Sequence, residues 1–135
     1  MSPRSTRRGF LVAAGGAVAV LAVRTGPWKA LVAYRSPSDA ERLVGMLTHV
    51  ESARVVGRAY LREVSRKRSV EGLVAEIASG LPGGRSSVRG TSDADLRRIV
   101  SASIRGDFAR EANVTVQGWI LSETEARLCA LAALL

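Results

Sequence analysis

The C-terminal stretch from Ser122 to Leu135 constrains the fold most, because it predicts a helix that is apolar on almost every side. Ser122 and Glu125 have the spacing of a capping box, in which each side chain bonds the backbone amide of the other residue. The apolar residues of this stretch are Leu128, Cys129, Leu131, Ala132, Leu134 and Leu135. A helix of this kind must be buried, either at the centre of a domain or against a partner.

Four further helices are predicted from capping residues and from apolar residues at helical spacing. A second capping box, Ser38 to Glu41, starts a helical pattern that continues to residue 65, and we expect a break near residue 50. The clearest amphipathic pattern covers residues 70–81, and another helix begins after Ser92 and reaches Phe108. The stretch from residue 80 to residue 90 contains four glycines and two serines, so it predicts a flexible surface loop.

One segment, Val114 to Leu121, departs from the helical pattern. It alternates in polarity and is rich in β-branched residues, which predicts a short extended strand. A strand needs a partner for its backbone groups, and the sequence shows no second strand. The segment then either lies along the helices as a loop or pairs with another chain. We therefore predict an all-α fold: one domain over residues 38–135, a bundle of about five helices, with this short extended segment before the last helix.

The N-terminus has the order of a targeting signal. The pair Arg7 and Arg8 follows Ser-Thr and precedes Phe10 and Leu11, which resembles the twin-arginine (Tat) export signal. The apolar run from Phe10 to Val23 is shorter than the roughly 20 residues that a membrane-spanning helix needs. We expect residues 1–23 to be a signal peptide, with its retention as an anchor left open. Residues 24–37 contain two X-Pro turns and are predicted to be a linker.

The positive charge of the chain is concentrated in this N-terminal region. The net charge is +8, from 20 basic and 12 acidic residues. Residues 1–35 contain six of the basic residues and none of the acidic ones, so residues 36–135 contain 14 against 12. A nucleic-acid-binding domain needs a basic patch on its folded surface, and a net charge of +2 argues against one. No nucleic-acid partner is expected.

Catalytic chemistry has no recognisable pattern in the sequence. The single histidine, His49, is far in sequence from the single cysteine, Cys129, and no His/Cys/Asp/Glu cluster has metal-ligand spacing. Cys129 lies in the apolar C-terminal helix, where a cysteine usually acts as a small buried hydrophobe. We predict no catalytic, metal or cofactor-binding residues, and a protein that is not an enzyme.

The layout is similar to that of the small subunit of periplasmic flavin-dependent sugar and alcohol dehydrogenases, such as the gluconate 2-dehydrogenase subunit 3 group. The matching parts are Ser5 to Leu11, the segment Val55 to Leu61 with the helix Val70 to Leu81 after it, and Val114 to Leu128. The resemblance implies a small helical subunit that has no catalytic residues. It also implies that the leader of this subunit carries a folded flavoprotein through the Tat system.

The function expected from the sequence is therefore that of an accessory subunit, exported to the periplasm or to the outer face of the cytoplasmic membrane. Its expected partners are the Tat translocase and a larger oxidoreductase, a flavin dehydrogenase by the resemblance. The candidate interface residues are Trp119, Ile120, Leu128, Leu131 and Leu135. The alternative is a stand-alone exported or membrane-tethered helical protein, with a homodimer closing its apolar helix. In both readings, membrane contact is expected only through an uncleaved leader.

Overall fold

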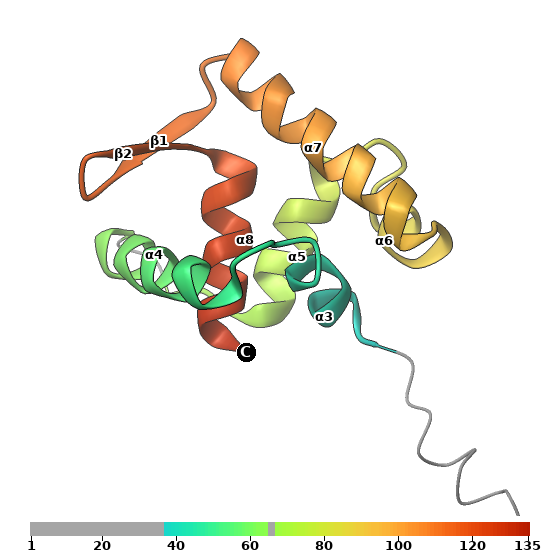
Figure 1. Cartoon of the computed structure of the whole chain (residues 1–135), viewed down its shortest axis with the longest axis horizontal. Coiled ribbons are helices and arrows are strands. Elements are labelled where there is room, and N and C mark those ends of the chain that lie inside the picture. The colour runs from blue at the N-terminus through green and yellow to red at the C-terminus, as the bar shows by residue number, and fades with distance from the viewer. Residues whose placement is uncertain (1–36, 65–66) are drawn as a thin grey trace, which may run out of the picture. The chain divides into compact units, whose positions relative to one another are not determined.

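The computed structural model describes residues 37–64 and 67–135 (Figure 1). The predicted leader, with Arg7, Arg8, Phe10 and Leu11, and the linker up to Ser36 lie outside the described residues. The stretch from Pro37 to Leu135 forms one compact unit.

The predicted fold class is confirmed: the described residues contain six helices, and a short extended region precedes the last of them. The elements in chain order are α3 (Asp39–Val44), α4 (Val50–Glu63), α5 (Val70–Ser79), α6 (Arg85–Gly90), α7 (Asp93–Ala109), β1 (Asn113–Val116), β2 (Trp119–Ser122) and α8 (Glu123–Leu134). The predicted break near residue 50 is also confirmed, because residues 45–49 separate α3 from α4. Both predicted capping boxes are present, at Ser38 and at Ser122.

The prediction of a loop over residues 80–90 is wrong in its second half, where the chain forms α6. Val88 is the only apolar residue of this helix, so no apolar stripe marks it in the sequence. Its side chain is nevertheless fully buried in the core. Arg42 of α3 donates hydrogen bonds to the carbonyls of Val88 and Thr91, where α6 ends. Contacts between residues distant in sequence therefore stabilise α6, and no local pattern encodes them.

The extended segment is a β-hairpin, which corrects the prediction of a single strand without a partner. β1 and β2 pair antiparallel, with Val116 opposite Trp119 and Thr115 opposite Ile120. Both strands come from the one predicted segment, and residues 117–118 form the turn between them. The partner strand was thus already inside the stretch that was assigned as one strand.

α8 is the central element of the domain, as its apolar sequence predicts. It packs against α3, α4, α5, α7 and both strands, and Figure 1 shows it in red near the centre of the view, running to the C-terminus. Leu128 is 1% exposed and Leu131 is fully buried. These two leucines are core residues, which corrects the expectation that they lie on a surface open to a partner. Burying a leucine side chain contributes about 2 kcal/mol, so α8 holds much of the core's stability.

The close packing of α4 on α8 depends on Gly57. A Cβ atom placed on Gly57 would lie 1.9 Å from the carbonyl oxygen of Cys129 and 2.8 Å from the backbone nitrogen of Ala130. Both atoms belong to the backbone of α8, so no side-chain rotation can relieve the clash. Gly57 is therefore the residue that allows the two helix backbones to approach each other directly.

The substitution Gly57→Ala tests this packing. We expect it to lower the free energy of unfolding by at least about 2 kcal/mol, because the overpacking cost outweighs the helix propensity that alanine adds. The matched control is Gly90→Ala, since nothing lies within 4 Å of a Cβ atom at Gly90. Chemical denaturation followed by circular dichroism measures both. A Gly57→Ala domain as stable as the Gly90→Ala domain would contradict the direct backbone contact.

Candidate docking surfaces

The N-terminus of α8 fixes the position of the hairpin, because backbone amides at this end of the helix form hydrogen bonds with groups at the two ends of the hairpin. The Ser122 hydroxyl accepts a hydrogen bond from the Glu125 amide at 3.0 Å, and the Glu125 carboxylate accepts one from the Ser122 amide. The amide of Glu123 donates to the carbonyl of Ala112, just before β1, at 3.1 Å. The first turn of α8 thus binds both ends of the hairpin.

Asp107 of α7 completes this end of α8. Its carboxylate accepts a hydrogen bond from the Thr124 amide at 2.9 Å and another from the Arg110 guanidinium at 2.8 Å. Asp107 is 5% exposed, and it is a buried acid that these two donors satisfy. Its negative charge also lies at the positive end of the α8 dipole. Asp107 therefore joins α7 to α8 at the base of the hairpin.

The hairpin turn has the backbone of a tight two-residue connection. Gln117 has φ 48° and Gly118 has φ 84°, and two successive positive φ values are typical of a type I′ turn. Glycine adopts this conformation freely, whereas glutamine adopts it with strain. The turn brings Trp119 back beside Val116, whose side chain is 2% exposed and anchors the hairpin to the domain.

Two large apolar side chains of β2 remain in solvent. Trp119 is 73% exposed and Ile120 is 63% exposed. They lie on opposite faces of the hairpin, because side chains alternate along a strand. Figure 1 shows the hairpin at the left of the view, above α4, against which β1 packs. No charged residue occurs from Ala112 to Ser122, so the whole hairpin is uncharged.

The helix α4 lies next to the hairpin, because α4 packs against β1, and α4 also has an exposed outer face. Val55 on this face is 58% exposed. Arg58 and Arg62 share the face by helical spacing, are exposed, and form no ion pair with any described residue. We call Val55, Arg58, Arg62, Trp119 and Ile120 the hairpin surface.

A second surface lies at the other end of α8, where Leu135 is 52% exposed. A groove of about 450 Å³ opens there. Its apolar residues are Ala40, Val70, Val74 and Leu135, and its charged residues are Asp39, Glu71, Arg85 and Arg89. We call it the C-terminal groove.

The charged rim of the C-terminal groove carries both signs. Arg89 lies 2.9 Å from the carboxylate of Asp39, and Arg85 lies 3.8 Å from the same carboxylate. The hydrogen bond to Asp39, together with the charge of this carboxylate, raises the pKa of Arg89 above its ordinary value. The rim thus presents two arginines paired with Asp39, together with Glu71, around an apolar floor.

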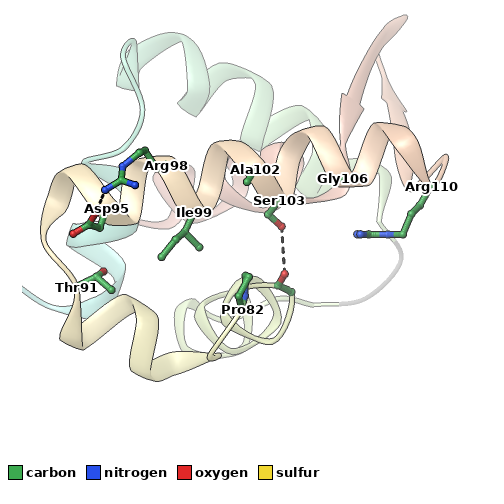
Figure 2. A pocket seen from close by; sticks show the side chains of 10 residues that line it. Pro82, Thr91, Asp95, Arg98, Ile99, Ala102, Ser103, Gly106 and Arg110 are labelled. Carbon is green, nitrogen blue, oxygen red and sulfur yellow. Dashed lines mark hydrogen bonds and ion pairs between the residues drawn. The ribbon is translucent and has the colours of Figure 1, made fainter.

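A second groove, of about 580 Å³, runs between α7 and the segment that precedes it (Figure 2). Ile99, Ala102 and Gly106 of α7 line it, and the Ser103 hydroxyl spans it to the Gly80 carbonyl at 3.3 Å. Arg98 and Arg110, which also line it, are each bonded to the carboxylate of a nearby aspartate. Both guanidinium groups are therefore paired with carboxylates, and the groove presents no unpaired charge to a ligand.

The single cysteine and the single histidine of the chain both lie in its described part. Cys129 is buried, and burial raises the pKa of its thiol to about 11, so the thiol is protonated at neutral pH and is a poor nucleophile. His49 precedes α4 and makes no side-chain capping bond. Within residues 37–64 and 67–135, no group of three or more His, Cys, Asp and Glu side chains is placed to hold a metal. None of the helices in these ranges has the length and apolarity to cross a membrane.

The structure separates the five interface residues predicted from the sequence into three places. Trp119 and Ile120 lie on the hairpin surface, Leu135 lies in the C-terminal groove, and Leu128 and Leu131 lie in the core. Sequence reasoning missed the outer face of α4. The signal for it was present, because Val55, Arg58 and Arg62 recur at helical spacing opposite the buried side.

Comparison with known proteins gives no relative: no family model, no curated protein and no solved structure matches the chain.

The substitution Gln117→Asn tests the turn that presents Trp119. Asparagine tolerates positive φ better than glutamine, so we expect the free energy of unfolding to rise by about 0.5–1 kcal/mol. Gln117→Val is the opposite case, because a β-branched residue is strained at this φ, and it should destabilise the domain. Thermal denaturation of the parent protein and the two variants gives their order of stability. A Gln117→Val protein at least as stable as Gln117→Asn would contradict the turn geometry.

Proposed function

We propose that this protein is a non-catalytic accessory subunit that is exported through the Tat pathway and binds a larger oxidoreductase in the periplasm or at the outer face of the cytoplasmic membrane. The observation that carries the proposal is the C-terminal groove. It combines an apolar floor with a rim of paired charges, at the end of the most buried helix of the domain.

The groove has the features of a protein interface. Interfaces combine an apolar centre with a polar rim, and charges of both signs on the rim select one partner and one orientation. Leu135 offers an exposed apolar side chain, and the hydrogen bond that Arg89 donates to Asp39 orients the charged groups beside it. The rigid α8 behind the groove lowers the entropy that docking costs, since its backbone is already ordered.

The other two parts of the proposal rest on the sequence. Export rests on Arg7 and Arg8 with Phe10 and Leu11, in the order of a Tat signal. The oxidoreductase class of the partner, and its flavin, rest on the resemblance to the small subunits of flavin-dependent dehydrogenases. A stand-alone exported protein, or a homodimer closed through Leu135, is the competing reading.

The experiment recovers the tagged full-length protein from the envelope of its own host. We expect a larger protein with flavin absorbance in the eluate. Leu135→Asp should reduce its recovery strongly, because it places a charge at the centre of the apolar floor. Arg105→Glu is the control, since Arg105 is an exposed residue of α7 that lines neither groove.

The same preparation tests export. The double variant Arg7→Lys, Arg8→Lys should leave the protein in the cytoplasm, because the Tat receptor reads the arginine pair. Unchanged export of this variant would contradict the Tat assignment. A colourless protein recovered alone, as a monomer or a dimer, would contradict the subunit assignment, and Leu135→Asp would then show whether the groove closes a dimer.

A further inference from the structure

We propose that the hairpin surface docks on an anionic lipid bilayer, with the hairpin tip in the interfacial layer and Arg58 and Arg62 against the headgroups. This goes beyond the proposed function and does not depend on it. It also replaces the protein partner expected from the sequence for Trp119 and Ile120 with a lipid surface.

The first argument is the chemistry of the hairpin tip. Trp119 and Ile120 are 73% and 63% exposed, and the strands around them contain no charged residue. Moving this tip out of water therefore requires no desolvation of a charge, which is the largest cost of entering a bilayer. A tryptophan ring combines an apolar body with one polar N–H group, and it favours the membrane–water interface.

The second argument limits the depth of insertion. The sheet has two strands, so the outer edge of each strand presents backbone groups that no neighbouring strand pairs within the described residues. Such groups are too costly to place in the hydrocarbon core, where water cannot bond them. The hairpin tip thus fits the interfacial layer and cannot cross it.

The third argument is charge complementarity. Arg58 and Arg62 lie on the outer face of α4, the helix that packs against β1 of the hairpin, and form no ion pair with a described residue. Glu63 follows Arg62 but lies about 100° further around the helix. Glu51 shares the face of Arg58, but it pairs with Arg54 at 2.7 Å. Unpaired cations beside an exposed apolar tip match the anionic headgroups and interfacial layer of a bilayer. The C-terminal groove differs on this point, because the arginines on its rim already pair with Asp39.

The test uses the full-length chain carrying Trp28→Phe. The sequence contains two tryptophans, Trp28 and Trp119, so Trp119 becomes the only tryptophan reporter. The probes are vesicles of phosphatidylcholine with phosphatidylglycerol, vesicles of phosphatidylcholine alone, and vesicles with bromine on the lipid acyl chains. We expect Trp119 emission to shift to shorter wavelength with the anionic vesicles. Bromine near the headgroup should quench it more strongly than bromine near the chain ends.

Matched variants distinguish membrane binding by the hairpin surface from membrane binding by the rest of the chain. Arg58→Glu with Arg62→Glu should weaken the partitioning reported by Trp119 by about 30-fold or more, because each basic residue near an anionic surface contributes about a fivefold change. Arg97→Glu with Arg105→Glu changes the net charge equally on exposed residues of α7, and should leave partitioning close to that of the parent chain. Circular dichroism shows whether each variant is folded.

Two results would overturn the proposal. If the chain sediments with anionic vesicles while Trp119 emission stays unshifted and unquenched, another segment holds the membrane and the hairpin does not. If Trp119 emission shifts only when a co-purified protein is added without lipid, the hairpin surface is a protein interface. Neither result bears on the C-terminal groove, so the proposed function is tested separately.

Discussion

The direct contact between the backbones of α4 and α8 at Gly57 is the constraint on which the rest of the structure depends. It lets α4 cover α8 closely enough to bury Cys129 and the alanines beside it, and it leaves the large side chains of α8 free to pack on α3, α5 and α7. In a domain of this size one buried helix can form the centre on which the other helices pack, because a small chain has little interior to share. The hairpin and the C-terminal groove are then held at the two ends of the same rigid element.

This arrangement separates two kinds of surface. α8 has 12 residues, so its ends are about 18 Å apart at 1.5 Å per residue. At one end, an uncharged hairpin stands beside unpaired arginines. At the other, an apolar groove has a rim whose arginines already pair with Asp39. We infer that the first surface suits an anionic membrane and the second suits a protein. If both proposals hold, the two surfaces would let the domain contact a membrane at one end of α8 and a protein at the other.

The sequence predicted those features that local rules determine. Capping boxes placed the starts of the first and last described helices, and helical spacing identified the buried stripes. α6 was missed because its burial depends on a single valine and on hydrogen bonds from Arg42, which is distant in sequence. The second strand was missed because glutamine is an unusual residue at a turn position with positive φ. The apolar pattern of the C-terminal helix does not distinguish its buried leucines from its exposed ones. Leu128 and Leu131 are core residues, whereas Leu135 is exposed. That distinction depends on which helices cover α8.

Native-state hydrogen exchange tests the central place of α8 most directly. If α8 is the core that α4 closes at Gly57, its amides and those of the middle of α4 should exchange only through global unfolding, with the highest protection in the domain. The amides at the hairpin tip should exchange much faster, since few contacts hold them. Exchange of α8 through local opening, while α3 and α7 stay protected, would contradict a fold organised around this helix.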